Sequence, residues 1–108
     1  MTDEFAGALR ERVSFEQKLA ERDALAATTG RYRYNGAAWA AVTPIGVGDA
    51  VAADALSALP RWRVMIRKRD GIDLATRLIW RGRYLHVRSI ECDPRERAHM
   101  VLVTEEQR

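Results

Sequence analysis

The strongest constraint on the fold is a segment in which basic and apolar side chains alternate. In residues 61–69, RWRVMIRKR, every second position from Trp62 to Ile66 is apolar. A period of two separates the faces of a β-strand but not those of a helix. The pattern predicts a strand with Trp62, Val64 and Ile66 on its buried face. Its other face would carry Arg61, Arg63, Met65, Arg67 and Arg69.

The segment that follows predicts a β-hairpin and one more strand. Asp70 and Gly71 begin a loop to Leu74, after which TRLIW and YLHVRSI flank the short turn RGR. Glycine in a short connection between two β-prone runs is typical of a hairpin, here about Gly82. AHMVLVTEE follows the turn CDPRER and predicts a final, fairly apolar strand.

Two strands are predicted in the first half of the chain. RVSFEQKLA alternates so that Val13 and Phe15 share one face. AAWAAVTPI predicts an extended run around Trp39 and Val42. This run ends at Pro44, because proline cannot donate a hydrogen bond to a central ladder.

The remaining segments predict one long loop and two helices. Residues 20–35 lack an apolar period and end in the Asn35-Gly36 pair, which favours a loop that closes with a turn. Thr2 would cap a short N-terminal helix, and residues 47–60 predict an internal, alanine-rich helix. The fold class is therefore mainly β, a small antiparallel β-barrel or sandwich of about six strands in one domain, residues 1–108.

The residues that usually carry chemistry are sparse. His86 and His99 are the only histidines and have no metal-binding spacing. Cys92 is the only cysteine, which excludes an intrachain disulfide and a zinc quartet. We expect no catalytic residues, no metal, no cofactor and no enzyme activity. We also expect no secretion signal, and no membrane span in residues 37–59, which proline, glycine and two acids interrupt.

Charge is distributed unevenly along the chain. Residues 61–88 hold nine basic and two acidic residues, a net +7 within an overall +3, so the rest carries −4. Such a patch could neutralise nucleic-acid phosphates while aromatic rings stack on bases. Alternatively, arginine stems cover the sheet while their heads pair with acids of this chain or of a neighbouring subunit. The rings considered are Trp62, Trp80 and Tyr84, and the acids are Glu91, Glu96 and Glu105.

The order of these motifs resembles a known family. ALRERVSFEQ, WAAVTPI and RWRVMIRKRDGIDLATRLIWRGRYLHVRSIECDPRERAHMVLVTEE are similar to the phage head-tail joining family. That family comprises the head-closure or stopper proteins of long-tailed phages and of gene transfer agents. The resemblance spans nearly all of residues 9–106. The matching positions are Arg10 and Val13 in the first strand, Trp39 and Ala40 in the central strand, and Gly82, Tyr84 and Ile90 in the hairpin.

The resemblance implies a structural virion protein that assembles as a ring, with six copies preferred and twelve possible. The ring would lie between the portal and adaptor above and the tail terminator below, in a particle made in the bacterial cytoplasm. It would continue the DNA channel without sequence-specific binding, retain the packaged genome and dock the tail. The alternative function is a small basic β-barrel that binds nucleic acid directly.

Two sets of residues are candidates for this role. A ring subunit needs two different contact patches, and opposed basic and acidic faces would set their register. The long loop departs from the family pattern, since DALAATTGRYRYNG lacks the usual Asp-Gly and extra tryptophan. The candidate interface comprises Arg61, Arg63, Arg67, Arg69, Arg81 and Arg83, and the candidate channel or gating loop comprises Arg22, Asp23, Thr28, Thr29, Arg31 and Arg33.

Overall fold

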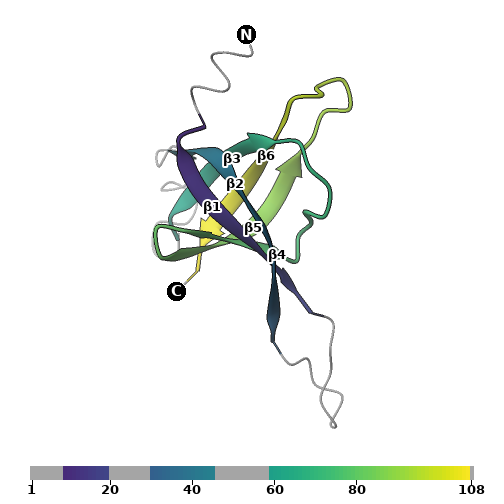
Figure 1. Cartoon of the computed structure of the whole chain (residues 1–108). Helices are drawn as coiled ribbons and strands as arrows, with labels where there is room; N and C mark the ends of the chain where they lie inside the picture. The colour runs from purple at the N-terminus through teal and green to yellow at the C-terminus, as the bar shows by residue number, and fades with distance from the viewer. Residues whose placement is uncertain (1–8, 20–29, 46–58, 108) are drawn as a thin grey trace.

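Six antiparallel strands form a closed barrel in the computed structural model, which describes residues 9–19, 30–45 and 59–107 (Figure 1). The order around the wall is β1-β2-β3-β6-β5-β4, and β4 pairs with β1 to close it. This confirms the predicted strand number and selects the barrel over the sandwich. The strands are β1 (Glu11–Lys18), β2 (Tyr32–Pro44), β3 (Arg61–Arg67), β4 (Thr76–Trp80), β5 (Arg83–Glu91) and β6 (His99–Glu106).

The interior is filled by alternate side chains from all six strands. Val13 and Phe15 of β1 are completely buried, as are Val64 and Ile66 of β3, which confirms the predicted parity of both strands. Trp62, the third inward residue of β3, is partly buried and packs against this core. The other members of the core are Ala40, Leu78, Trp80, Leu85, Val87, Met100 and Leu102.

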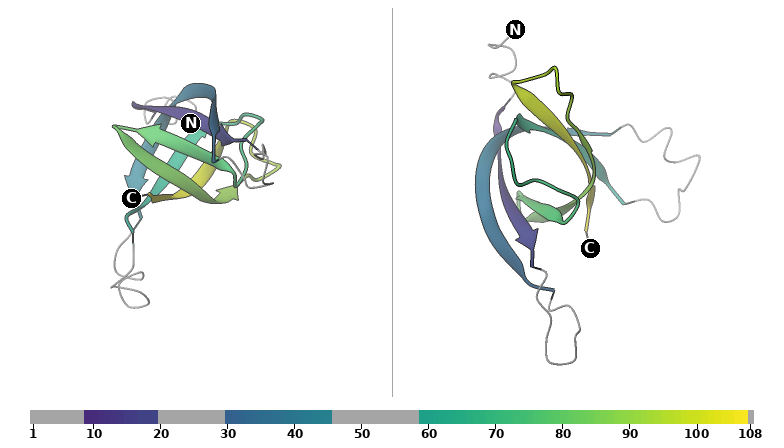
Figure 2. Two further views of the ribbon diagram at one scale, coloured as in Figure 1. Left: turned by 90° about the horizontal axis from the view of Figure 1, so that it is seen from below. Right: turned by 90° about the vertical axis from the view of Figure 1, so that its right-hand side faces the viewer.

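The two ends of the barrel differ in what they carry (Figures 1 and 2). At one end lie Trp62 and Trp80, the start of β1, the end of β6 and the short β4–β5 turn; we call this the tryptophan end. The opposite end carries the connections β1–β2, β3–β4 and β5–β6, and we call it the hairpin end. There the β3–β4 connection lies across the opening of the barrel (Figure 2, right).

The predicted hairpin about Gly82 is confirmed. Trp80 and Arg83 are paired across β4 and β5, so the loop contains only Arg81 and Gly82. Both loop residues have positive φ, 50° and 75° respectively. Two central residues with positive φ characterise the type I′ turn, whose twist matches that of the flanking strands.

The turn predicted at Asn35-Gly36 is wrong, because both residues lie inside β2. The β1–β2 register shifts between Ser14 and Glu16, so that Asn35 and Gly36 together lie opposite Phe15. This is a β-bulge, and Gly36 adopts a φ of 97° there. A glycine with positive φ suits a bulge as well as a turn, and the dipeptide alone does not distinguish them.

Other boundaries also differ from the sequence prediction. The long loop predicted over residues 20–35 is described only from residue 30 on. Its last four residues belong to β2, which begins at Tyr32. β3 ends at Arg67, so Arg69 belongs to the β3–β4 connection rather than to the strand. The predicted N-terminal helix falls on residues that are mostly undescribed, and the internal helix predicted over residues 47–60 lies outside the described residues except for Leu59 and Pro60, which are not helical.

Candidate assembly surfaces

Aromatic rings capped by arginines form the tryptophan end. The ring centroids of Trp62 and Trp80 lie 4.8 Å apart in an edge-to-face arrangement. The guanidinium carbon of Arg83 lies 5.9 Å from the Trp62 centroid and 5.6 Å from that of Trp80, and Arg81 lies 5.2 Å from Trp80. Since Trp80 is only 5% exposed, these rings are packed in the barrel and do not form an open platform for bases.

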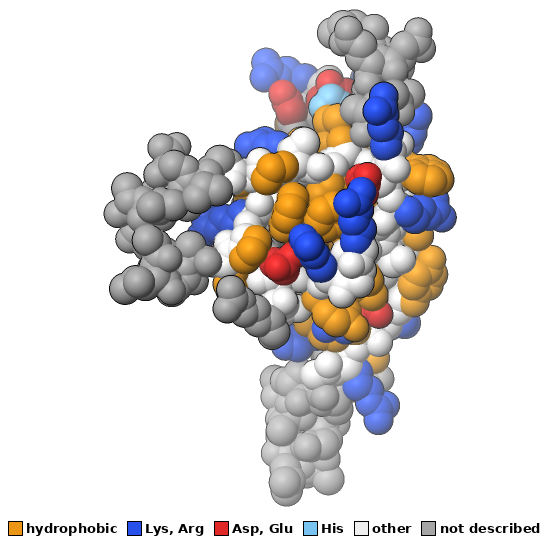
Figure 3. All heavy atoms as spheres, turned by 90° about the vertical axis from the view of Figure 1, so that its left-hand side faces the viewer, with side chains coloured by type: hydrophobic (Ala, Val, Ile, Leu, Met, Phe, Trp, Pro, Cys, Tyr) orange, Lys and Arg blue, Asp and Glu red, His pale blue; other side chains and the backbone are white. Residues whose placement is uncertain are grey.

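Acidic side chains pair with these capping arginines, and acidic and basic groups lie side by side on this face (Figure 3). Glu11 accepts hydrogen bonds from Trp80 Nε1 at 2.9 Å and from Arg81 Nε at 2.9 Å. These two bonds lower the pKa of Glu11 below its ordinary value. Arg83 Nη1 lies 3.4 Å from Glu106 Oε1.

Two buried polar atoms at the tryptophan end lack a hydrogen bond within the described part of the chain. They are the indole Nε1 of Trp62 and Oε1 of Glu106. The 3.4 Å contact between Arg83 and Glu106 is an ion pair without hydrogen-bond geometry. Both atoms are enclosed by the packing of this end, beneath Arg83.

Further ion pairs run along the outer wall of β3, β5 and β6. Arg63 Nη1 lies 3.0 Å from Glu91 Oε2. Glu105 lies 3.4 Å from Arg61 and 2.8 Å from Arg88, and the hydrogen bond from Arg88 lowers the pKa of Glu105. Because β6 lies between β3 and β5, Glu105 is within reach of arginines from both strands. The predicted pairing with Glu91 and Glu105 is therefore confirmed.

Glu96 behaves differently from the prediction. Its carboxylate accepts a hydrogen bond from the Ala98 amide and lies 3.6 Å from His99 Nδ1. It serves the β5–β6 connection rather than the arginine-rich strands. Which acidic residue lies near which strand depends on the topology of the barrel, and strand parity alone does not predict that topology.

The basic segment 61–88 and the acidic residues outside it are separate in the sequence, but their side chains lie next to one another in the folded protein. The arginines at positions 61, 63, 77, 81, 83 and 88 are each paired with a glutamate of this chain. All of these glutamates lie outside residues 61–88, where the sequence has its net −4. The expected opposition of one basic and one acidic face is therefore not supported, and these guanidiniums would have to exchange partners to bind phosphates.

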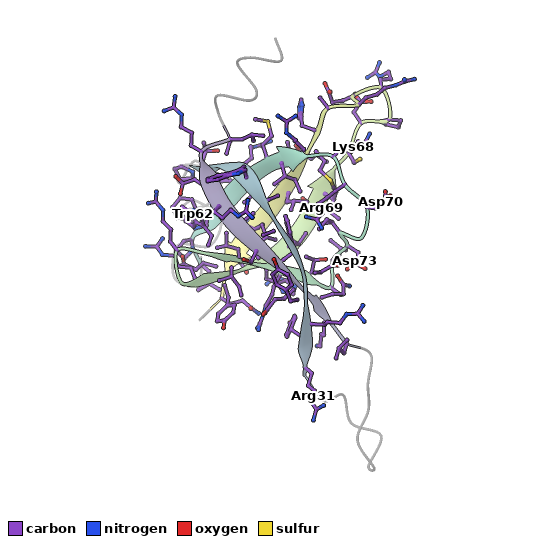
Figure 4. All side chains as sticks on the ribbon, in the orientation of Figure 1. Arg31, Trp62, Lys68, Arg69, Asp70 and Asp73 are labelled. Carbon is purple, nitrogen blue, oxygen red and sulfur yellow. The ribbon has the colours of Figure 1, made fainter. Side chains whose placement is uncertain are left out.

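Two of the candidate interface arginines differ in position from the rest. Arg67 ends β3, opposite His99 of β6. Arg69 lies at the hairpin end, where its guanidinium carbon is 4.6 Å from the Phe15 ring centroid and Nη2 donates to the backbone oxygen of Asn35 at 3.0 Å. Arg69 thus points back toward the barrel (Figure 4) and does not continue the stripe of β3.

The sequence analysis placed Trp39 in a strand without recognising its exposed side, and it did not single out Tyr34. Tyr34 is 65% exposed and Trp39 is 54% exposed, both on the outer face of β2. Arg12 of β1 covers one side of Trp39, with its guanidinium carbon 5.3 Å from the ring centroid. In a strand, Trp39 and Ala40 must point to opposite faces, so the sequence could have predicted an exposed Trp39 if Ala40 had been recognised as buried. Alanines lie on both sides of Trp39, however, and the sequence does not show which face of this strand is the inner one.

A more enclosed ion pair lies on the outer face of β1 and β4. Arg77 Nε donates to Glu16 Oε1 at 2.7 Å, and both side chains are only about one fifth exposed, at 21% and 22%. The guanidinium carbon lies 3.7 Å from the Tyr32 ring centroid and 4.2 Å from that of Tyr84. Tyr84, considered as a base-stacking ring, is therefore already occupied on one face by Arg77.

The candidate gating residues are described only in part. Arg31 and Arg33 lie on the β2 side of the β1–β2 hairpin, which projects from the barrel (Figure 1). Arg31 is at the far tip of the described stem and points away from the barrel (Figure 4). The other four candidates, Arg22, Asp23, Thr28 and Thr29, lie outside the described residues.

The histidines and the cysteine do not converge on a reactive site. Burial lowers the pKa of His86, and the neighbouring Arg88 adds to this effect. His99 contacts Glu96, and Cys92 is exposed in the β5–β6 connection. Within the described ranges there is no cluster of three or more potential metal ligands. Nor do those ranges contain a helix long and apolar enough to span a membrane.

Comparison with known proteins gives one family and several similar structures, two of which follow. A family model described as phage head completion protein matches residues 6–107. The solution structure of protein SF1141 from Shigella flexneri 2a has a TM-score of 0.71 at 23% identity, covering 93% of this chain and 94% of that one. A chain from the virion of a native gene transfer agent particle has a TM-score of 0.68 at 15% identity, covering 92% and 96%. No curated protein matches the sequence.

Proposed function

The chain belongs to the phage head completion protein family, and from this membership we propose that it is a structural protein of the virion, located between the DNA-filled head and the tail. The match over residues 6–107 is the observation that carries the proposal. The fold agrees with it, because a chain from a gene transfer agent virion has the same barrel. The particle is a phage or a gene transfer agent, assembled in the bacterial cytoplasm.

In this proposal the protein forms a ring, with six copies preferred and twelve possible. The ring contacts the adaptor and portal on one side and the tail terminator on the other. It continues the DNA channel, retains the packaged genome without sequence-specific binding, and has no enzymatic activity. A barrel with two dissimilar ends suits a place between two different partners, because each end can recognise one of them.

The outer wall of the barrel supports contacts between neighbouring subunits. Trp39 and Tyr34 are large aromatic side chains left in water, and aromatic residues with arginines are enriched at the centres of protein interfaces. We assign the outward arginines Arg61, Arg63 and Arg67 to the same contact. Since Arg61 and Arg63 already pair with glutamates, they would contribute orientation more than net charge.

The tryptophan end supports a contact with a different protein. It presents Arg81 and Arg83 over packed indole rings, with half or more of each arginine side chain exposed and so accessible to a partner. The β1–β2 hairpin projects from the opposite end, and we assign Arg31 and Arg33 on this hairpin to the channel, near the DNA backbone. Basic residues without base-reading geometry suit DNA that slides past.

The alternative function, a free nucleic-acid-binding barrel, has less support. Trp62 and Trp80 are packed against each other beneath arginines, and most of the candidate arginines hold glutamates. A binder that releases several counterions loses affinity steeply with salt. Tight, salt-sensitive DNA binding by the purified protein would favour this alternative, whereas no binding at low salt would exclude it.

Complementation of a deletion strain tests the proposed location. Electron microscopy should show heads that hold DNA and tails when the wild-type gene is supplied, with the protein as an annulus at the junction. Exchanging Arg63 and Arg67 for glutamate should abolish tailed particles while circular dichroism shows a folded domain. Exchanging both for lysine, which keeps the charge, is the matched control. Finding the protein only free or only inside the capsid would contradict the proposal.

A further inference from the structure

The outer part of the β1–β2 hairpin has few neighbouring strands. β2 pairs with β3 only over Ala40–Pro44, and β1 pairs with β4 only over Ser14–Gln17, so beyond Gln17 the two hairpin strands have only each other. A two-stranded ribbon by itself is at best marginally stable in water. Contacts outside the sheet therefore add to the support of the hairpin, and both of its strands contact the β3–β4 connection, residues 68–75.

The first contact is on the β2 side, at the bulge. Arg69 Nη2 donates to the backbone oxygen of Asn35 at 3.0 Å, and Asn35 Nδ2 donates to the backbone oxygen of Gly71 at 3.2 Å. A Cβ at Gly36 would lie 2.7 Å from Arg69 Nη2. The guanidinium of Arg69 thus occupies the space left by the missing side chain of Gly36, and its other contact is the ring of Phe15.

The second contact is on the β1 side. Gln17 Nε2 donates to both carboxylate oxygens of Asp73, at 2.9 and 3.1 Å, and Gln17 Oε1 accepts from Thr76 Oγ1 at 2.8 Å. The Asp73 carboxylate also accepts from the Ala75 amide at 2.8 Å. The amide of Lys18 donates to the Ala75 oxygen at 3.2 Å. Both polar atoms of the Gln17 side chain are thus engaged, Nε2 with this connection and Oε1 with Thr76 at the start of β4.

We propose that residues 68–75 form a bracket that fixes the direction in which the β1–β2 hairpin projects, with Arg69 and Asp73 as its positioning residues. The bracket holds the hairpin at two points, one on each strand, which prevents rotation as well as bending. The use of this fixed direction in the particle, to place the hairpin relative to the DNA channel, rests on the proposed function.

The neighbouring residue supplies a matched control. Lys68 Nζ donates to the backbone oxygens of Asp93 and Glu96, at 3.2 and 2.7 Å, and so contacts the β5–β6 connection instead of the hairpin. Figure 4 shows Lys68, Arg69 and Asp73 on the same connection, with Asp70 between them pointing outward. The adjacent side chains of Lys68 and Arg69 are both basic and similar in length, but Lys68 contacts the β5–β6 connection whereas Arg69 contacts the β1–β2 hairpin.

The test compares Arg69→Met with Lys68→Met in the purified full chain, by amide hydrogen exchange and residual dipolar couplings. Arg69→Met should accelerate exchange of the Lys18 and Leu19 amides, which bond to Ala75 and Arg31, by about tenfold, and should broaden the hairpin orientation. Lys68→Met should leave both unchanged and instead accelerate exchange at the Glu96 amide, which bonds to Asp93.

Asp73→Asn provides a second, milder variant in case Arg69→Met folds poorly. It retains the side-chain volume but removes the charge that accepts the Gln17 bonds, and should give a smaller loss of hairpin protection. Unchanged hairpin exchange and orientation in both variants would overturn the bracket. Because no particle is needed, that result would leave the proposed location in the virion untouched. A mobile hairpin in a variant that still gives normal tailed particles would refute only its use in the particle.

Discussion

Arginine caps an aromatic ring at both ends of the barrel, but the two caps are built differently. At the tryptophan end, Arg83 and Arg81 lie over indole rings and their charges meet carboxylates, with half or more of each arginine side chain exposed. At the hairpin end, Arg69 lies over Phe15 and donates to a backbone oxygen of a bulge. The first arrangement leaves a surface that can still exchange partners, whereas the second is part of the framework.

The comparison predicts the largest effect for a substitution at the hairpin end, Gly36→Ala. A positive φ of 97° costs a side chain about 1 kcal/mol or more, and the added Cβ displaces Arg69 from its two contacts. We expect a loss of about 2 kcal/mol in the free energy of unfolding, measured by urea denaturation. Gly82→Ala, also at positive φ but with open space around it, should lose only about 1 kcal/mol.

Equal losses in the two glycine variants would show that backbone strain alone matters. The distinctive part of the prediction is the difference between them, which reports the contacts of Arg69. Combining Gly36→Ala with Arg69→Met should cost less than the sum of the single losses, because both remove the same contacts.

An intermediate effect is expected where an arginine on the wall is enclosed. Arg77→Met removes a guanidinium that lies against two tyrosine rings and leaves the carboxylate of Glu16 without its partner. The expected loss is about 1 kcal/mol in the same assay. Arg63→Met breaks a pair whose side chains are about half exposed and should change stability by at most about 0.5 kcal/mol. Similar losses for both would contradict the distinction between enclosed and exposed pairs.

The smallest expected effect is a dependence on pH at the bracket. The hydrogen bond from Gln17 lowers the pKa of Asp73 below its ordinary value of 3.8, so the folded state favours the ionised form. The stabilisation is therefore present above pH 3.8 and is lost as the pH falls through the folded-state pKa. Wild type should exceed Asp73→Asn in stability near neutral pH, and the difference should shrink in acid. A difference that stays constant with pH would exclude the carboxylate as its source.

Strand parity predicted much of the barrel, because it depends on local alternation. Val13, Phe15, Val64 and Ile66 were placed correctly inside, and the turn at Gly82 was found from its composition. Pairing between strands distant in sequence was less accessible. That Glu105 meets both Arg61 and Arg88 follows from the insertion of β6 between β3 and β5, a property of the closed topology.

The candidate site was predicted less well than the fold, for related physical reasons. The arginines were identified as a group, but their partners lie outside the basic segment, so their charge was overestimated as a binding feature. Trp39 was assigned to a strand without its exposed side being recognised. The bracket combines residues near positions 17, 35 and 70, and neither half has a recognisable motif of its own.

The described chain enters and leaves the barrel at the tryptophan end, through Leu9 and Gln107. A fluorescent protein or affinity tag fused at either position would therefore crowd the same side of the molecule, and comparing the two fusions would not distinguish one side from the other. A reporter for the opposite side has to be attached within a loop. Cys92, exposed in the β5–β6 connection and the only thiol in the sequence, is a natural attachment point for a small dye there.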